Sequence, residues 1–492
     1  MKKTEKDKNP NTYRTFQIHI SPTHPMFSYC KEMCQFAKNM YNTTNFYIRQ
    51  IYTSLKSEKP LQPLQQEVMD QLRMHLPLVN ENQYKAYEKK LLMESKKPAE
   101  EQKEVKLNLM EMPKEEKSFP SYNLLDALFK SMKQADYKSL PAQSSQGVMK
   151  AVYQGWSSFF ASIEEYAINP SKFSGRPKIP KYNKTMVKEV YFTNQDCKIQ
   201  NGMYLKFPKT KQRLCIGKVA EFDGKLQQVR VIPSYNQFTV EMVFKQNNIV
   251  EIPEKPKYER MMSIDLGVNN LATIVMNTGR RPVIVKGKTV KSINQYYNKK
   301  RAYLYGILRQ GKEKREGLFT SKKLERLGRK RFLKIKDMFH KMSYNIVQLA
   351  VQEGIDTIIV GKNNGWKQEL EMRKDAKQNF VQLPHNLFIQ QITYKANTKG
   401  IHVVTVEESY TSKASFLDFD DIPTYGQTEI EPVFTGKRVK RGLYRSAEGT
   451  YLNADVNGAG NILRKVVPNA FEPFKSNGIE GAVSHPRVLS VR

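Results

Sequence analysis

Ser263-Ile264-Asp265-Leu266-Gly267-Val268-Asn269-Asn270 lies just past the midpoint of the chain and separates two short apolar runs. The first run begins at Met261 and ends at Asp265, and the second occupies residues 271–275. Two apolar runs joined by a polar turn that contains glycine predict a hairpin of two buried strands. Asp265 lies at the tip of this hairpin, where a carboxylate is useful only with partners, normally a metal ion and further carboxylates. We therefore expect other acidic residues of the chain to meet Asp265.

The charge balance points to an anionic partner. The chain has 492 residues, with 81 Lys and Arg against 48 Asp and Glu, which is a formal net charge of +33. Such a surplus concerns binding partners rather than the fold, and nucleic acid is the leading candidate, well ahead of a membrane surface. The length and the apolar content predict a folded protein of about two to four domains.

Neither a membrane segment nor a disulfide framework is expected. No apolar run reaches the ~20 residues that span a bilayer, and the first residues are polar and charged. These features predict a soluble, intracellular protein. The four cysteines are too few for a disulfide framework in so long a chain. Cys30 and Cys34 are spaced to share one face of a helix, so we expect core residues there rather than metal ligands.

The N-terminal half changes from a helical to a strand-like pattern. Residues 13–20 alternate as in a strand, residues 26–168 are mainly helical, and residues 187–244 are strand-like, which predicts a small β-barrel. The proline-containing loop 173–182 carries four candidate contacts with nucleic acid: Arg176, Lys178, Lys181 and Tyr182. Basic residues beside an aromatic side chain suit a nucleic-acid backbone. A rigid linker with solvated charges is an equally good interpretation.

The C-terminal half combines a basic helical region with an α/β pattern. Residues 286–341 are helical and strongly basic, and their candidate contacts with nucleic acid are Lys322, Lys323, Arg329, Lys330 and Arg331. A solvated helix face is the alternative, which the almost unrelieved positive sign disfavours. A strand at 357–360, a helix at 387–399 and a strand at 401–406 follow. This alternation predicts an α/β core with parallel strands.

Asp455 is the candidate partner of Asp265. It precedes a run of small and apolar residues, in which Asp455, Ala459 and Ile462 fall on one helical face. In the first turn of such a helix, the carboxylate can face inward against a sheet. Interaction with the helix dipole is the alternative, and locally it is the more common role.

In this order, the segments resemble the RuvC-like nuclease domain of the transposon-encoded TnpB proteins and of their descendants, the compact type V CRISPR effectors. The Asp265 hairpin is similar to the first RuvC motif of that family, and residues 453–457 are similar to the third. Residues 173–182 resemble its Gly-Arg-Pro-x-x-Pro segment, and Tyr410-Thr411-Ser412 resembles the entry to its zinc-finger region. The resemblance covers most of residues 150–466.

The resemblance implies a multidomain α+β fold. It has an N-terminal α-helical recognition domain, assigned by position only, a small β-barrel (wedge) domain and a C-terminal RNase H-like α/β (RuvC) nuclease domain. The implied boundaries are 1–22 for the first part of the wedge domain, 23–168 for the recognition domain, 169–256 for the wedge domain, 257–410 and 451–466 for the RuvC-like domain, 411–450 for a degenerate zinc-finger-like insert that binds target nucleic acid, and 467–492 for a C-terminal tail.

Two departures from the family pattern matter for function. The glutamate of the second motif would end the strand at 357–360, but Gly361 occupies that position. Residues 413–450 contain no cysteine. A structural zinc ion needs thiolates or histidines, so we predict that no zinc is bound.

Glu407 and Glu408, at the end of the next strand, are the candidates to replace the missing glutamate. The carboxyl ends of neighbouring parallel strands meet at one edge of a sheet, ~4.8 Å apart. Alternation puts Glu408 on the face of Val404 and Val406, with Glu407 on the other face. We expect Glu408 to complete the site, with Glu407 as the alternative. If both are surface residues, the nuclease is inactive.

The resemblance implies an RNA-guided DNA endonuclease. Asp265, Glu408 and Asp455 would bind two Mg²⁺ ions and hydrolyse a phosphodiester, with one ion activating water and the other stabilising the leaving oxygen. The implied partners are a guide RNA, of the omega or the CRISPR type, and double-stranded target DNA beside a short flanking motif. The expected location is the bacterial cytoplasm, on the nucleoid during activity. The oligomeric state stays open.

Two other functions are compatible with single features of the sequence. Gly361 motivates a catalytically inactive, RNA-guided DNA-binding protein that acts as a repressor. An actin-like ATPase also has a phosphate-binding hairpin that begins with Asp-Leu-Gly. That fold requires a second Asp-x-Gly hairpin and a glycine-rich adenosine loop, and the sequence shows neither.

Overall fold

The computed structural model describes residues 12–362, 383–424, 432–472, 483 and 485–489. The chain divides into two compact units, an N-terminal unit of Arg14–Asn247 and a C-terminal unit of Asn248–Arg492 together with Met1–Tyr13. The start of the predicted wedge segment, residues 1–11, and most of the predicted tail lie outside the described residues. Within the described ranges, no helix is long and apolar enough to cross a membrane.

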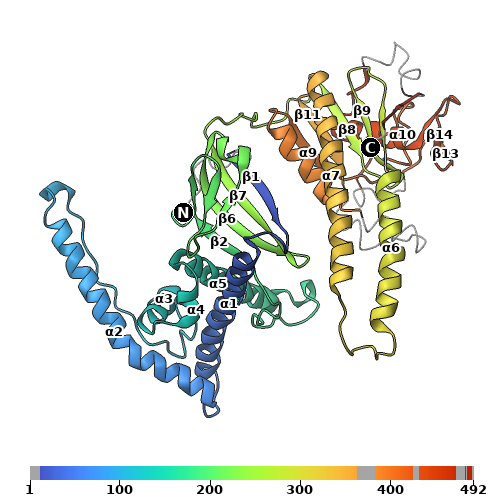
Figure 1. The fold of residues 1–492 in the computed structure, drawn as a ribbon. Helices are drawn as coiled ribbons and strands as arrows, with labels where there is room; N and C mark the ends of the chain where they lie inside the picture. Colours follow the sequence, from blue (N-terminus) through green and yellow to red (C-terminus); the bar gives the residue numbers. More distant parts are fainter. Residues whose placement is uncertain (1–11, 363–382, 425–431, 473–482, 484, 490–492) are drawn as a thin grey trace. The chain divides into compact units, whose positions relative to one another are not determined.

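Helices fill much of the N-terminal unit (Figure 1). They are α1 (Phe27–Leu55), α2 (Pro63–Glu94), α3 (Tyr122–Ser131), α4 (Ala135–Ser139) and α5 (Ala142–Ile168), with the short 3-10 helices η2 (Ala99–Glu101), η3 (Pro170–Lys172) and η4 (Gly217–Glu221). α5 ends just before Asn169-Pro170, because the residue before a proline disfavours the helical conformation. The helical pattern predicted for residues 26–168 is confirmed.

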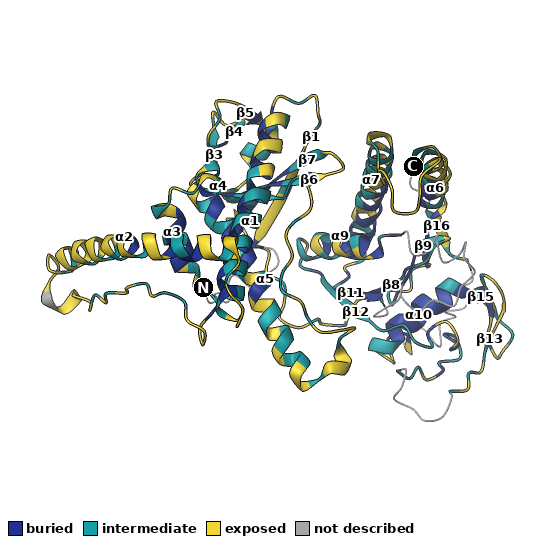
Figure 2. Cartoon of the chain, turned by 90° about the horizontal axis from the view of Figure 1, so that it is seen from below, coloured by how far each residue is buried: buried dark blue, intermediate teal, exposed yellow. Residues whose placement is uncertain are grey.

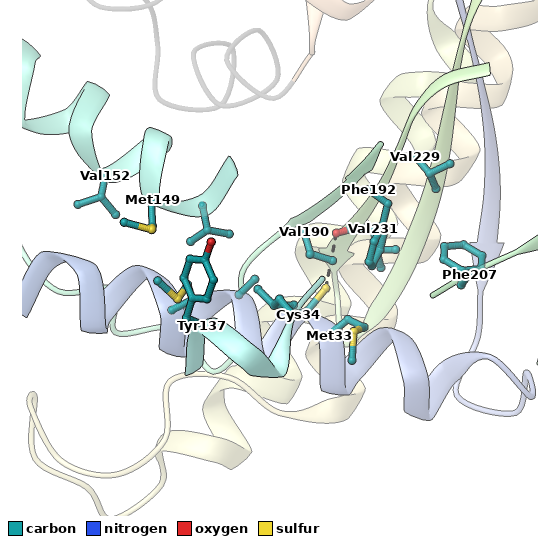
Figure 3. Close-up of a cluster of buried hydrophobic side chains, with 14 of the residues drawn as sticks. Met33, Cys34, Tyr137, Met149, Val152, Val190, Phe192, Phe207, Val229 and Val231 are labelled. Carbon is teal, nitrogen blue, oxygen red and sulfur yellow. Dashed lines mark hydrogen bonds between the residues drawn. The ribbon is translucent and has the colours of Figure 1, made fainter. Parts of the chain in front are cut away.

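A buried apolar cluster joins these helices to the strands of the unit (Figure 3). Trp156 of α5 is fully buried, and its indole N–H donates to Asn45 Oδ1 of α1 at 2.9 Å. Cys30 and Cys34 are both fully buried on α1, and the Cys34 thiol donates to the carbonyl oxygen of Val231 at 3.5 Å. The predicted core role of these two cysteines is confirmed.

The strands of the N-terminal unit form two sheets, with the strand orders β1-β7-β6-β2 and β3-β4-β5. Their bounds are β1 (Tyr13–Ile20), β2 (Val190–Thr193), β3 (Lys198–Gln200), β4 (Tyr204–Lys206), β5 (Arg213–Cys215), β6 (Gly224–Ser234) and β7 (Gln237–Gln246). β6 and β7 form a long antiparallel hairpin. The strands predicted at residues 13–20 and within 187–244 are confirmed.

The C-terminal unit is built on a six-stranded sheet with the order β12-β11-β8-β9-β10-β16. Its strands are β8 (Met261–Asp265), β9 (Asn270–Met276), β10 (Val283–Lys286), β11 (Thr357–Gly361), β12 (His402–Val406) and β16 (Arg487–Leu489). β8 and β9 form the predicted antiparallel hairpin. β11 pairs in parallel with both β8 and β12, which confirms the predicted parallel core.

Helices cover both faces of this sheet (Figures 1 and 2). They are α6 (Lys288–Arg309), α7 (Lys322–Gln352), α9 (His385–Asn397) and α10 (Ala454–Val466). Phe339 of α7 and Phe388 of α9 pack in the core on one face, and Ile462 of α10 packs in the core on the other. The hydroxyl of Ser263 donates to the carbonyl oxygen of a residue in α10 at 2.6 Å. Because side chains alternate along a strand, Asp265 shares the α10 face with Ser263.

Two further parts complete the C-terminal unit. β13 (Lys437–Lys440) and β14 (Leu443–Arg445), which lie in the predicted insert, form a small antiparallel sheet with β15 (Tyr451–Asn453), which lies just after it. α6 and α7 lie side by side as a long helical hairpin, as Figure 1 shows. Helical and mixed α/β parts thus occur in one chain, and the predicted multidomain α+β class is confirmed.

Candidate active site

Three strand ends meet at one edge of the six-stranded sheet. Gly361 at the end of β11 pairs with Val406 at the end of β12. The preceding Val360 pairs with Ile264, the residue before Asp265. The carboxyl ends of β8, β11 and β12 are therefore in register. This edge combines Asp265, the end of β11 and the first residues after β12.

Glu408 occupies the space that Gly361 leaves open. A Cβ atom added at Gly361 would overlap Glu408 Oε1 and would lie 2.7 Å from Ile462 Cδ1, so a side chain at this position would displace the glutamate. α10 approaches the same edge closely, since a Cβ atom added at Gly458 would lie 3.0 Å from Asp265 Oδ2. The glycine at the second-motif position and the glutamate one strand away therefore belong to one arrangement.

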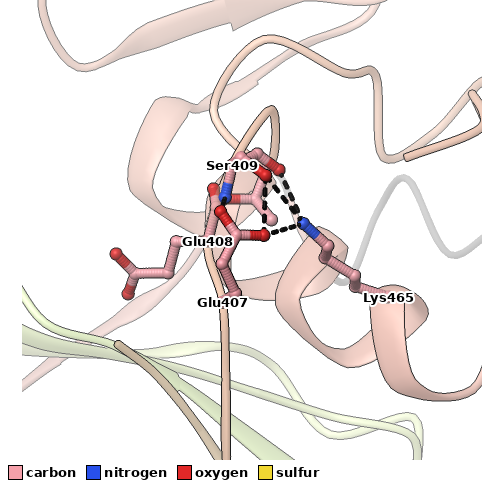
Figure 4. A network of polar contacts seen from close by, with 5 residues as sticks. Glu407, Glu408, Ser409 and Lys465 are labelled. Carbon is pink, nitrogen blue, oxygen red and sulfur yellow. Dashed lines mark hydrogen bonds and ion pairs between the residues drawn. The ribbon is translucent and has the colours of Figure 1, made fainter. Parts of the chain in front are cut away.

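Glu407 points away from Glu408 and is held by α10 (Figure 4). Lys465, whose side chain is only 6% exposed, donates to Glu407 Oε2 at 2.6 Å and to the carbonyl and hydroxyl oxygens of Ser409 at 3.1 Å. The backbone N–H of Ser409 donates to Glu407 Oε1 at 2.7 Å. Although burial acts in the opposite direction, these hydrogen bonds lower the pKa of Glu407. The network fixes the segment that presents Glu408.

Asp455 lies in the first turn of α10, but Asn453 caps this helix. The side-chain oxygen of Asn453 accepts hydrogen bonds from two backbone N–H groups of the first turn at 2.9 and 3.3 Å. Asp455 Oδ2 accepts a hydrogen bond from Asn270 Nδ2 at 2.6 Å, and Lys286 Nζ donates to Asn270 Oδ1 at 3.1 Å. Asp455 thus contacts the hairpin that carries Asp265, and the side-chain capping role is filled by its neighbour.

Burial and mutual repulsion raise the pKa values of two of these acids. Burial, followed by Asp455, raises the pKa of Asp265 to about 7, and the positive charge of Arg438 acts in the opposite direction. Burial, followed by Asp265 and Glu407, raises the pKa of Glu408 to about 8. Asp265 is therefore electrostatically coupled to both other acids. A cation bound among them would relieve the repulsion and lower both pKa values.

The chemistry of these acids fits a divalent cation. Carboxylate oxygens are the ligands that Mg²⁺ prefers in proteins. In the part of the chain that the structure describes, no group of three or more His, Cys, Asp or Glu residues is close enough to hold one metal ion together. The acids instead form two coupled pairs, Asp265 with Asp455 and Asp265 with Glu408. They fit a divalent cation in charge and donor type, with Asp265 common to both pairs.

The loop 173–182 is attached to α1. The carbonyl oxygen of Pro180 accepts hydrogen bonds from Arg49 Nη1 at 2.8 Å and from Asn45 Nδ2 at 3.2 Å. The Arg49 guanidinium lies 5.1 Å from the ring centroid of Tyr182. The predicted contacts Arg176, Lys178, Lys181 and Tyr182 are all exposed. These contacts hold the loop against α1, and they are compatible both with nucleic-acid binding and with a rigid linker.

The other predicted contacts with nucleic acid lie on α7. Lys322, Lys323 and Lys330 are exposed, and Arg329 and Arg331 are half-buried. Arg331 Nε donates to Asn294 Oδ1 of α6 at 2.6 Å, and its guanidinium lies 5.0 Å from the ring centroid of Tyr297. Arg331 therefore also joins the two helices of the hairpin.

Aspartates hold the cysteine-free insert together. Asp420 Oδ2 accepts hydrogen bonds from the backbone N–H groups of Ser415 at 2.7 Å and Thr435 at 3.1 Å. Asp418 Oδ2 accepts hydrogen bonds from the Ser415 hydroxyl at 2.5 Å and the Ala447 N–H at 2.8 Å. Three segments of the insert are tied in this way, which is the task that metal ligands perform in a zinc finger.

Three residues around the acids were not predicted from the sequence: Asn270, which binds Asp455, Lys286, which binds Asn270, and Lys465, which binds Glu407. Asn270 closes the polar turn after Asp265, so its position beside an acid was a usable signal. Lys286 and Lys465 carry no local signal, because their contacts depend on how β10 and α10 pack against the hairpin and β12.

Two family models match the C-terminal part of the chain. Residues 237–367 match the OrfB_IS605 family, described as a probable transposase. Residues 385–462 match the TNB domain of Cas12f1-like proteins. The first match spans β8, β9 and β11, and the second spans β12 and most of α10. Together they cover the strands and the helix from which the acidic residues project.

Individual relatives agree with these families. TnpB-like protein ORF457 of Acidianus two-tailed virus is 26% identical over 243 residues, which are 48% of this chain and 48% of that protein. CRISPR-associated endodeoxyribonuclease Cas12f1 of Sulfoacidibacillus thermotolerans is 26% identical over 218 residues, 43% of this chain and 46% of that protein. The chain thus spans about half the length of the curated relatives it matches.

Among solved structures, a Cas12f1–sgRNA–target DNA complex aligns with a TM-score of 0.41 and 12% identity, covering 92% of this chain and 98% of that chain. The two family matches and the relatives confirm the resemblance of this chain to the TnpB-type proteins and the compact type V CRISPR effectors.

Proposed function

We propose that the chain is an RNA-guided endonuclease that cuts DNA at the carboxylate edge, defined as Asp265, Glu408 and Asp455. One observation carries this proposal. Glu408 fills the space beside Gly361, the position at which the related family has its second-motif glutamate. The raised pKa of Glu408, caused by burial and then by Asp265, supports an acid directed toward the site.

The residues of the carboxylate edge have distinct roles in this proposal. Mg²⁺ ions bound there would supply an activated water and would neutralise charge on the phosphodiester. Asp265, Glu408 and Asp455 would hold these ions, and Asp265 is the acid that interacts electrostatically with both of the others. Asn270 orients Asp455 through its 2.6 Å hydrogen bond. The positive charge of Arg438 partly offsets the rise in the pKa of Asp265, so Arg438 lies close enough to contact a phosphate at the edge.

The proposed partners are a guide RNA and double-stranded DNA. The net charge of +33 and the exposed cations on the loop 173–182 and on α7 support nucleic-acid binding. Matched relatives are named CRISPR-associated endodeoxyribonucleases, which supports DNA as the substrate. Base pairing with the guide would supply sequence specificity, while the protein reads a short flanking motif.

A cleavage assay with two neighbouring glutamates tests the proposal. The full chain is expressed with its flanking genomic DNA, and the RNA that copurifies is sequenced. The complex is then given Mg²⁺ and a plasmid library in which the matching target is flanked by randomised positions. We expect Glu408→Gln to slow cleavage by about 100-fold or more, because it removes one metal ligand. The matched variant Glu407→Gln should slow cleavage by no more than about 10-fold, because its side chain points toward Lys465 and a glutamine oxygen can still accept one of the hydrogen bonds that hold the segment.

Three results would change the proposal. The opposite order of effects would assign the site to Glu407. Full activity of Asp265→Asn would overturn the carboxylate edge altogether. Guided binding by the wild-type chain without cleavage, in Mg²⁺ and in Mn²⁺, would support the catalytically inactive DNA-binding protein instead.

A further inference from the structure

A cleft lies between the two helices of the α6–α7 hairpin. It has a volume of about 370 Å³, and every lining residue comes from α6 or α7. This size lies within the range of about 300–1,000 Å³ that is typical of small-molecule sites. We call it the α6–α7 cleft, and the residues that bear on its chemistry are Tyr296, Tyr297, Lys330, Arg331 and Lys334.

Aromatic rings line the α6 side of the cleft. Tyr296 is 59% exposed, which leaves its ring accessible to a planar partner. Tyr297 lies beneath the Arg331 guanidinium at 5.0 Å. The Arg331 Nε also donates to the buried Asn294 at 2.6 Å, so the planar guanidinium is held in one orientation. The cleft therefore offers flat surfaces for stacking.

Cations line the α7 side of the cleft. Lys330 and Lys334 are exposed and lie one helical turn apart on the same face. Among the described residues, no acidic side chain lines the cleft. α6 contains no acidic residue, and neither of the acidic residues of α7, Glu325 and Asp337, lines the cleft; the Asp337 carboxylate pairs with Lys341 at 3.1 Å. The positive charge of the cleft is thus not neutralised from within.

We propose that the α6–α7 cleft binds one unpaired nucleotide of a single-stranded nucleic acid. The base would stack on Tyr296, and the flanking phosphates would contact Lys330 and Lys334. Stacking on an exposed aromatic ring beside a cationic track is the mode by which proteins bind single strands without reading their sequence. A base-paired duplex offers no free base face, so the cleft favours a displaced or unpaired strand. This inference rests on the proposed function as a nucleic-acid-binding nuclease.

A fluorescence titration of the full-length protein tests the cleft. The probes are 12-nucleotide DNA and RNA single strands that carry one 2-aminopurine, whose fluorescence is quenched on stacking, and the same DNA strand paired with its complement. We expect saturable quenching with the single strands and at least about 5-fold weaker binding for Tyr296→Leu, the loss of one stacked base. Tyr303→Leu is the matched control, because Tyr303 is 65% exposed on the same helix but does not line the cleft.

The outcomes separate this inference from the proposed nuclease. If Tyr296→Leu and Tyr303→Leu weaken single-strand binding equally, or if Tyr296→Leu quenches as strongly as wild type, the cleft is not the binding site. Neither result would affect the proposal of guided cleavage. Quenching that survives in Asp265→Asn and disappears in Tyr296→Leu supports the cleft independently of cleavage. Equal quenching by the duplex probe, or displacement of the strand by millimolar AMP, would show a different ligand and overturn the proposal. The DNA and RNA probes show which strand the cleft prefers.

Discussion

The carboxylate edge and the α6–α7 hairpin belong to the same unit but use charge in opposite ways. At the edge, a few acids are held at single positions: Asn270 binds Asp455, and Gly361 leaves room for Glu408. On the hairpin, many cations are exposed, whereas Arg331 forms a hydrogen bond with Asn294 of the neighbouring helix. Catalysis requires a few groups at defined positions, whereas binding a polyanion requires a density of charge. The two regions should therefore respond differently to substitution.

The largest effect is expected when the acid common to both pairs is removed. Asp265→Asn should lower guided cleavage by about 1,000-fold or more, because it removes a charge needed to hold divalent ions. Binding of nucleic acid, measured by filter retention in the same buffer, should change by less than about 2-fold, since the cations are elsewhere. A large loss of binding would break the distinction between the two regions.

Substitution of Gly361 should have the next largest effect. Gly361→Ala places a Cβ atom against Glu408 and should slow cleavage by about 10- to 100-fold through misplacement of the carboxylate. Gly306→Ala is the matched control, because a Cβ atom at this α6 position meets nothing within 4 Å. It should leave cleavage unchanged.

Exchanging the residues at positions 361 and 408 tests whether the edge requires the carboxylate at one position. Gly361→Glu combined with Glu408→Gly returns the carboxylate to β11 and empties the space that it must occupy. The double variant should cleave at least about 10-fold faster than Glu408→Gly alone, because it restores a metal ligand. No recovery would show that the edge requires a carboxylate at position 408, after β12, and not merely a third carboxylate.

The buried acids of the carboxylate edge should make the stability of the metal-free protein depend on pH. The pKa values of Asp265 and Glu408 are raised to about 7 and about 8, above those of an unfolded chain. The unfolded state therefore loses these protons first, and metal-free protein should become less stable as the pH rises from about 4 through 8. Thermal denaturation in EDTA should show a flatter profile for Asp265→Asn than for wild type. Added Mg²⁺ should restore stability at high pH, and a profile insensitive to both changes would contradict the coupling.

The smallest effect is expected on the hairpin. The double variant Lys322→Gln and Lys323→Gln should weaken nucleic-acid binding only several-fold. The slope of log Kd against the logarithm of the salt concentration should fall by at most about two. The cleavage rate of the saturated complex should not change. A loss of cleavage under saturating conditions would show that these exposed cations act at a defined position, as the acids do.

Much of the edge was predictable because its framework is local. Alternation along 401–406 assigned Glu408 and Glu407 to different faces, and the structure shows the two side chains pointing apart. Gly361, in place of the glutamate of the related family, predicts that another strand end supplies the third acid. The partners of the acids were not predictable in the same way. Lys465 meets Glu407 across 58 residues, and Asn270 meets Asp455 across 185 residues, so no periodicity of the chain connects them.

The hairpin at Asp265, the parallel strands beside it and the positive charge of the chain can be read from the sequence, because apolar periodicity and composition are local properties. The contact of Glu408 with Gly361, the electrostatic interaction of Asp265 with two acids and the cleft between α6 and α7 are visible only in the folded chain. These features depend on the register between strands and on the packing of helices. Both are settled by contacts between residues that are distant in the chain.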